Sequence, residues 1–144
     1  MKRIEQVIIT GFGKFADVLV NPTTQIVNSL EAENWQPENV PVEFHIVEVS
    51  TTATDQLLEN IPDGDKILRI HLGVDKRATC FKLERTAYNN MNFRVPDENG
   101  FMPSDQCIDS LDLEAAVCTT LNLDEVCGAM NVKGVDFVFI LNST

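Results

Sequence analysis

Apolar positions along the chain follow two periods, one typical of buried strands and one typical of amphipathic helices. The consecutive apolar residues Val7–Ile9 indicate a strand buried on both faces, and the spacing of Ile26 and Leu30 indicates a helix. The same analysis predicts strands at 6–11, 42–49, 67–72 and 135–141, and helices at 22–33, from 52 to about 61, at 112–121 and from 122 to about 134. Strands that alternate with helices predict an α/β fold, a three-layer α/β/α sandwich with a mainly parallel twisted sheet.

Helix starts carry characteristic capping residues. Asn21 suits the N-cap of a helix whose first turn contains Pro22. The segment Thr52–Asp55 resembles a second helix start, and Asn122–Glu125 has the pattern of a capping box. Two segments lack a clear period: residues 80–94 are expected to form short extended pieces with Asn-rich turns, and residues 96–103 a polar, exposed loop.

Length and charge limit the class of protein. The chain has 144 residues, which predicts one domain, and its net charge is −11 with a pI near 4.4. This charge argues against binding to nucleic acid or to anionic membrane surfaces. No apolar run approaches the length of a membrane span, and the N-terminus lacks the apolar segment of a secretory signal. We therefore expect a cytoplasmic protein, and a homo-oligomer is possible.

Cysteines and histidines show no spacing typical of a metal site. The cysteines are Cys80, Cys107, Cys118 and Cys127, and no two of them form a C-x-x-C pair. We therefore expect reduced thiols, no bound metal and no cofactor. Cys118 and Cys127 lie in segments predicted as helices. His45 and His71 both alternate with apolar residues, which favours core or edge histidines over catalytic ones. No Cys–His pair can be assigned from the sequence.

A glycine-rich turn follows the first predicted strand. The segment GFGKFA, Gly11–Ala16, fits the dinucleotide-binding fingerprint, but that site needs a helix at its second glycine. The N-cap and proline at Asn21–Pro22 place the helix start about nine residues too late, which argues against a dinucleotide site. The turn instead places Phe12 and Phe15 at the edge of the sheet, and the alternative is that both are ordinary core residues.

Several short motifs occur in a specific order: GFGKF at 11–15, VNP at 20–22, LGV at 72–74, LER at 83–85, AYN at 87–89 and FRVPD at 93–97, followed by Asn99–Gly100 and Pro103. In this order and spacing the chain resembles the pyroglutamyl peptidases, also called pyrrolidone-carboxylate peptidases, over most of its length. Lys14 replaces a proline usual in the family, and residues 105–121 match little.

The resemblance implies a cysteine exopeptidase that removes N-terminal pyroglutamate from peptides with a Cys–His–acid triad. Glu84 would be the acid of that triad, although a solvated glutamate in a surface ion pair is the alternative. The implied pocket has six members: Phe12 and Phe15 on the faces of the pyrrolidone ring, the backbone near Val74 at the lactam, Arg94 near the scissile carbonyl, Val95 as a wall and, in a looser alignment, Thr51. Asn21 would hold the glycine turn.

The chain stops shortly before the segment that carries the nucleophile in this family, and the family's histidine comes later still. We therefore expect residues 1–144 to be a single α/β peptidase domain with its C-terminal part missing, truncated before the nucleophile and inactive alone. Two other accounts are open: the remainder lies on another chain, or the protein is a naturally short homologue. The latter would be a non-catalytic binding module for N-terminal pyroglutamate.

Overall fold

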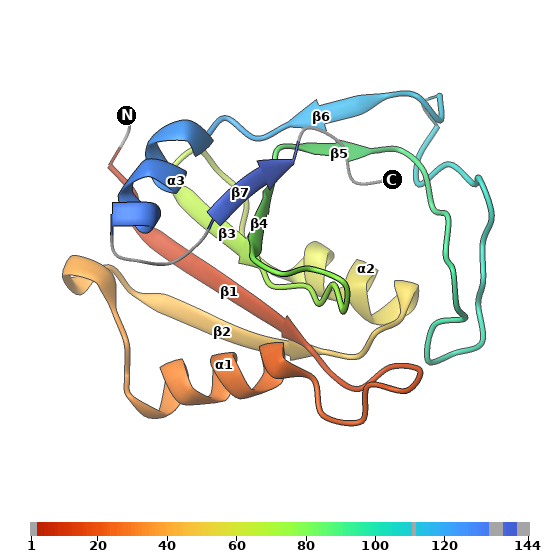
Figure 1. The fold of residues 1–144 in the computed structure, drawn as a ribbon, viewed down its shortest axis with the longest axis horizontal. Helices are drawn as coiled ribbons and strands as arrows, with labels where there is room; N and C mark the ends of the chain where they lie inside the picture. Colours follow the sequence, from red (N-terminus) through yellow and green to blue (C-terminus); the bar gives the residue numbers. More distant parts are fainter. Residues whose placement is uncertain (1–2, 111, 133–136, 141–144) are drawn as a thin grey trace. The chain divides into compact units, whose positions relative to one another are not determined.

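The computed structural model describes residues 3–110, 112–132 and 137–140 (Figure 1). Its contacts divide the chain into two compact units. Unit 1 consists of Met1–Val74 and Arg94–Met102, and unit 2 of Asp75–Phe93 and Pro103–Thr144. Each unit is considered by itself below, and the expectation of a single domain over residues 1–144 stays a prediction.

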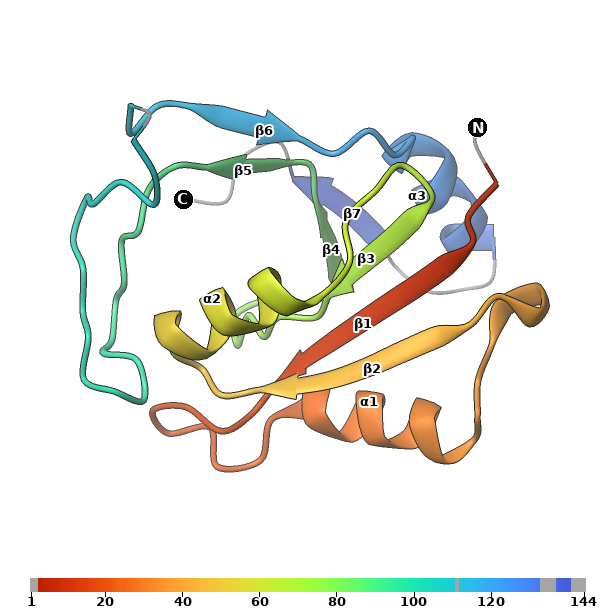
Figure 2. The same ribbon diagram turned by 180° about the vertical axis from the view of Figure 1, so that it is seen from behind.

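Unit 1 is built on a parallel sheet in the order β2-β1-β3. Its elements in chain order are β1 (Gln6–Phe12), α1 (Pro22–Ala32), the 3-10 turn η1 (Pro37–Asn39), β2 (Val42–Val47), α2 (Thr51–Asn60) and β3 (Ile67–His71). The crossovers from β1 to β2 and from β2 to β3 run in opposite directions across the sheet. Because such crossovers are right-handed, α1 and α2 lie on opposite faces, as the two opposite views show (Figures 1 and 2). The expected parallel sheet with helices on both faces is confirmed.

The core of unit 1 lies between α1 and one face of this sheet. Val7 and Ile9 of β1 pack with Val27 of α1, and all three are at most 4% exposed. The apolar positions of both neighbouring strands that face the same way complete this layer: Val42, Phe44, Leu68 and Ile70. Ile8 and Thr10 point to the other face and are also fully buried. The central strand is thus buried on both faces, as its continuous apolar run predicts.

Unit 2 contains short elements. These are β4 (Phe81–Glu84), β5 (Thr86–Tyr88), β6 (Ala116–Cys118), α3 (Leu123–Val132) and β7 (Phe137–Ile140). β4 pairs with β7 in parallel, and β5 pairs with β6 in antiparallel orientation. The expected extended pieces between residues 80 and 94 are confirmed, and β7 lies within the strand expected at 135–141, whose ends fall outside the described residues.

The helix predicted at 112–121 is wrong, because this segment contains strand β6. Val117 of β6 lies opposite Ala87 of β5, and the backbone N–H of Asn89 donates to the carbonyl of Ala115 at 2.9 Å. The sequence of residues 112–121 does not reveal their partner strand β5. The spacing of their apolar residues, taken alone, favoured a helix. Cys118 accordingly lies in a strand and is exposed. Cys127 lies in a helix, α3, as predicted, and the structure shows that it is buried.

Helix caps follow the sequence closely. Asn21 Oδ1 accepts from the backbone N–H of Thr23 at 3.0 Å, which confirms the cap of α1. The capping box of α3 is also present, with the N–H of Glu125 donating to Asn122 Oδ1 at 3.3 Å. The expected end of α3 near residue 134 lies outside the described residues. For α2 the predicted start is too late, because Ser50 is the N-cap and β2 ends at Val47.

Candidate functional site

The carboxyl ends of the three parallel strands of unit 1 meet at one edge of the sheet. Phe12 is the last residue of β1, Thr51 begins the helix that follows β2, and Val74 lies just beyond β3. All three side chains are half-buried. Ligands of open α/β sheets bind at this edge, so the fold brings three of the expected pocket residues to the usual place for a site.

The turn after β1 is held by the first turn of α1. The backbone N–H of Phe12 donates to the hydroxyl of Thr23 at 2.8 Å, and its carbonyl accepts from the hydroxyl of Thr24 at 2.7 Å. The side-chain amide of Asn21 donates to the carbonyl of Gly13 at 2.8 Å. Asn21 therefore both caps α1 and holds the turn, as the family resemblance implies.

Gly11 allows helix α1 to lie in close contact with strand β1. A Cβ atom at Gly11 would lie 2.7 Å from the carbonyl oxygen of Thr23 and 2.8 Å from Cγ2 of Val27. The glycine is thus required by the contact of β1 with α1. Because α1 begins only at Pro22, no helix N-terminus follows Gly13 directly, and the dinucleotide interpretation has no structural support.

Phe15 lies in the loop between β1 and α1. It forms an isolated antiparallel bridge with Val18, whose N–H donates to the carbonyl of Phe15 at 2.8 Å. The ring is half-buried and Val18 is buried, whereas Leu19 is 78% exposed. The two expected clamp residues therefore both lie at the carboxyl end of β1. That their ring faces enclose one cleft beside Val74 and Val95 stays a prediction.

The loop with Arg94 and Val95 belongs to the same unit and is tied to the same edge. Asp97 makes this connection, because its Oδ2 accepts from the backbone N–H of Thr51 at 3.0 Å and from its hydroxyl at 3.4 Å. In addition, the N–H of Glu98 donates to the carbonyl of Val49 at 2.9 Å. Arg94 and Val95 themselves are exposed.

The loop at 96–103 is exposed as expected except at Asp97, which is only 8% exposed, and at Pro103, which is fully buried. Asp97 Oδ1 accepts from the backbone N–H groups of Asn99 and Phe101, both at 2.9 Å, which bends the loop around the carboxylate. Desolvation raises the pKa of Asp97, but the hydrogen bonds from Thr51, Phe101 and Asn99 outweigh it and hold the pKa below its ordinary value. Asp97 is therefore ionised at neutral pH.

Glu84, the expected acid, is the last residue of β4 in unit 2 and is exposed. The six expected pocket residues all belong to unit 1. Both histidines of the chain belong to unit 1 and all four cysteines to unit 2. His45 pairs with Glu43 at 2.8 Å, and partial burial together with the charge of Arg69 lowers the pKa of His71.

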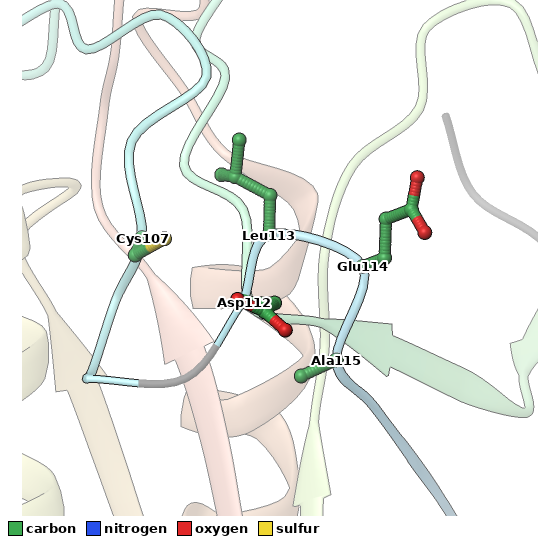
Figure 3. A pocket seen from close by; sticks show the side chains of 5 residues that line it. All are labelled: Cys107, Asp112, Leu113, Glu114 and Ala115. Carbon is green, nitrogen blue, oxygen red and sulfur yellow. The ribbon is translucent and has the colours of Figure 1, made fainter.

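Neither of two surface hollows among the described residues is lined by an expected pocket residue. One, of about 640 Å³, is in unit 2 and is lined by Cys107, Asp112, Leu113, Glu114 and Ala115 (Figure 3). The other, of about 350 Å³, lies before β1 and β2, at the opposite edge of the unit 1 sheet, and its lining includes Arg3, Glu5 and Glu38. Within the described part of the chain, no three His, Cys, Asp or Glu side chains are arranged to hold a metal ion. Nor is any described helix long and apolar enough to span a membrane.

The family model described as pyroglutamyl peptidase matches residues 5–140. The chain belongs to this family. The pyrrolidone-carboxylate peptidase of Thermococcus litoralis is 29% identical over 133 residues, which are 92% of this chain and 59% of the relative. Pyroglutamyl-peptidase 1 of Homo sapiens is 27% identical over 136 residues, which are 90% of this chain and 61% of the relative. This pyroglutamyl peptidase family member thus spans about three fifths of these relatives.

Solved structures of the family have the same fold. The pyrrolidone carboxyl peptidase of Fervidobacterium islandicum AW-1 matches with a TM-score of 0.85 and 24% identity, over 96% of this chain and 66% of that one. A mutant pyrrolidone carboxyl peptidase of Pyrococcus furiosus matches with a TM-score of 0.81 and 26% identity, over 96% of this chain and 65% of that one. The α/β fold expected from the alternation of strands and helices is confirmed.

Three residues of the site were missed by sequence reasoning. Asp97 was part of a matched motif, but nothing in the sequence indicated that its carboxylate reaches Thr51. Thr23 and Thr24 directly follow the Asn21–Pro22 helix start. This position was the only feature of the sequence that could have indicated their role. Their contacts join segments that are 11 to 46 residues apart, which local patterns do not reveal.

Proposed function

We propose that this chain binds the N-terminal pyroglutamate of peptides at the carboxyl edge of the unit 1 sheet. The observation that carries this proposal is the hydrogen-bond tie between Asp97 and Thr51, which brings the Arg94–Met102 loop to the strand ends. Pocket residues from four separate segments of the sequence thereby belong to one compact unit. Family membership supports pyroglutamate as the ligand.

The chemistry of the proposed pocket fits a small neutral lactam. In the proposed complex Phe12 and Phe15 cover the two faces of the ring, which has apolar carbons and a polar edge. The backbone near Val74 pairs with the lactam amide. The remaining members are Thr51 and Val95 as walls and Arg94 beside the scissile carbonyl. The aromatic and aliphatic members supply contact area, and the few polar groups set the orientation.

For a complete enzyme we propose hydrolysis by a cysteine thiolate that attacks the exocyclic carbonyl carbon of the pyroglutamyl residue and forms a thioester. A histidine takes the thiol proton and gives it to the amine of the next residue as the peptide bond breaks, and water then hydrolyses the thioester to pyroglutamic acid and free thiol. Glu84 would hold the imidazole in one orientation and stabilise its protonated form. Neither unit of this chain contains both a cysteine and a histidine. Cys118 Sγ lies 3.5 Å from the hydroxyl of Thr86 on the neighbouring strand. We therefore propose that residues 1–144 by themselves bind pyroglutamyl peptides without cutting them.

The second candidate is a binding module that recognises N-terminal pyroglutamate and performs no hydrolysis in its natural setting. It is favoured by the same observation, that both histidines belong to unit 1 and all four cysteines to unit 2. We also propose a cytoplasmic location, because the exposed free thiols of Cys107 and Cys118 suit a reducing compartment.

Calorimetric titration of residues 1–144 with pyroglutamyl-alanine tests the binding site, with prolyl-alanine and glutamyl-alanine as controls. We expect binding of the pyroglutamyl dipeptide alone, because only it carries the neutral lactam. Equal affinity for all three dipeptides, or none, would contradict the proposal.

Release of a dye from a pyroglutamyl reporter tests hydrolysis by the same preparation. We expect no turnover above a matched blank. Thiol-sensitive turnover would show that a described cysteine is the nucleophile. If the 144-residue chain binds but does not cut, activity of any longer product of the same gene separates the two candidates, because the binding module predicts none.

A further inference from the structure

We infer that Thr23 and Thr24, in the first turn of α1, are positioning residues that hold Phe12 in place and thereby set the size of the lactam ring that the site accepts. The inference rests on the proposed function, because it takes Phe12 as one face of the clamp. Neither threonine need touch the ligand. Both would act through the backbone of Phe12.

The two hydroxyl groups hold both polar groups of the Phe12 backbone. The N–H of Phe12 donates to Thr23 Oγ1 at 2.8 Å, and Thr24 Oγ1 donates to the Phe12 carbonyl at 2.7 Å. Phe12 is the last residue of β1 and lies opposite Val47 of β2, whereas the pairing of β1 with β3 ends at Thr10. The adjacent threonines thus bond the Phe12 backbone where β3 no longer does.

The side chains of Asn21, Thr23 and Thr24 form one hydrogen-bond network with the Phe12 backbone. The single hydroxyl proton of Thr23 goes to Asn21 Oδ1 at 2.8 Å, since the Phe12 carbonyl is farther away at 3.3 Å and already accepts from Thr24. Asn21 in turn donates to the Gly13 carbonyl at 2.8 Å. Asn21 and Thr23 are 3% and 4% exposed. Removing the Thr23 hydroxyl would therefore leave the backbone N–H of half-buried Phe12 without its partner, and removing the Thr24 hydroxyl would leave the Phe12 carbonyl with only the 3.3 Å contact to Thr23.

The helix that carries the threonines is itself immobilised on the sheet. Val27 of α1 is 1% exposed and packs against Val7 and Ile9. At Gly11 the strand lies so close to α1 that a Cβ would be 2.7 Å from the Thr23 carbonyl oxygen. The threonines thus connect Phe12 to the rigid core of unit 1, whereas Phe15 lies in the loop beyond.

A fixed Phe12 limits the space between the two rings of the clamp. A five-membered lactam and its six-membered homologue differ by one methylene group, and apolar pockets discriminate such pairs by roughly 10- to 200-fold. If Phe12 is released from the threonines, the larger ring should be accommodated at lower cost. The ratio of the two affinities is a property that general destabilisation of the fold does not change.

The experiment compares Thr23→Val and Thr24→Val with Thr23→Ser and Thr24→Ser in the full 144-residue chain. Valine has the shape of threonine without its hydroxyl, and serine keeps the hydroxyl. Thr52→Val is the matched control, because Thr52 is the second residue of α2, as Thr23 is of α1, and is exposed. The ligands are pyroglutamic acid amide and 6-oxopiperidine-2-carboxamide, and their affinities are measured by calorimetry or by ligand-observed NMR.

We expect the wild-type chain to prefer the five-membered ring by at least about 10-fold. Each valine variant should lower this preference by about threefold or more, and the serine variants and Thr52→Val should retain it. Exchange of the Phe12 amide hydrogen should also be faster in Thr23→Val and unchanged in Thr23→Ser. If Thr23→Val does not fold, Thr24→Val answers the question, because Thr24 is only half-buried.

Two contrary outcomes are distinguishable. A wild-type chain that binds neither lactam would overturn the proposed function and this inference together. A wild-type chain that discriminates, with valine variants that keep the same ratio, would overturn this inference alone.

Discussion

The carboxylate of Asp97 accepts two hydrogen bonds from Thr51, one from the backbone N–H at 3.0 Å and one from the hydroxyl at 3.4 Å. Thr51 is the first residue of α2, so the negative charge of Asp97 lies at the positive end of the helix dipole. The same carboxylate accepts from Asn99 and Phe101 of its own loop. One side chain thus determines where the Arg94–Met102 loop meets the carboxyl edge of the sheet.

Substitution Asp97→Asn should lower stability in a pH-dependent manner. The folded protein holds the pKa of Asp97 below its ordinary value of 3.8, so its contribution is present above about pH 4 and is lost as the pH falls through the lower folded pKa. The difference in unfolding midpoint between wild type and variant, measured by urea denaturation between pH 7 and pH 3, should therefore narrow in acid. The control is Asp55→Asn, at an exposed position of α2. A gap that stays constant over this range would contradict the role of the Asp97 charge.

Substitution Gly11→Ala should destabilise the chain by about 1–3 kcal/mol, the usual cost of forcing extra atoms into a packed site. The new methyl group would lie within 2.8 Å of atoms of both Thr23 and Val27. Gly128 offers a matched control, because it lies in α3 with open space around it. Gly128→Ala should stabilise by about 0.5–1 kcal/mol, since alanine favours helices. Urea denaturation measures both, and equal effects would contradict the close approach at Gly11.

Substitutions Phe12→Ala and Phe15→Ala should each weaken binding of a pyroglutamyl dipeptide by roughly 1–3 kcal/mol, the scale of a lost buried aromatic contact. Calorimetric titration measures the loss. Phe81→Ala serves as control, because Phe81 belongs to unit 2 and is 59% exposed. Unchanged affinity in both clamp variants would return these phenylalanines to an ordinary packing role.

Substitution Glu84→Gln, made in a complete enzyme that contains this segment, should reduce kcat while leaving the unfolding midpoint unchanged. Glutamine keeps the size of the side chain but cannot stabilise the histidine in its protonated form. Glu59→Gln is the control, at an exposed position of α2. Full turnover by Glu84→Gln would assign Glu84 to a surface ion pair instead.

Features that depend on neighbouring residues could be predicted from the sequence alone. The apolar run of β1 and the Asn21–Pro22 helix start were both correct, because burial on two faces and N-capping follow from a few consecutive side chains. The order of short motifs sufficed to identify the family and, through it, the candidate pocket and acid residues.

Features that depend on partners far along the chain were decided by the tertiary structure. Residues 116–118 form a strand because β5 offers them backbone hydrogen bonds, whereas their own spacing also suits a helix. Asp97 is buried because Thr51, 46 residues away, donates to it, and Phe12 is held by threonines 11 and 12 residues away. Local sequence patterns indicate which secondary structure a segment favours. Which hydrogen-bond partners its backbone and polar side chains find depends on segments that only the tertiary structure brings together.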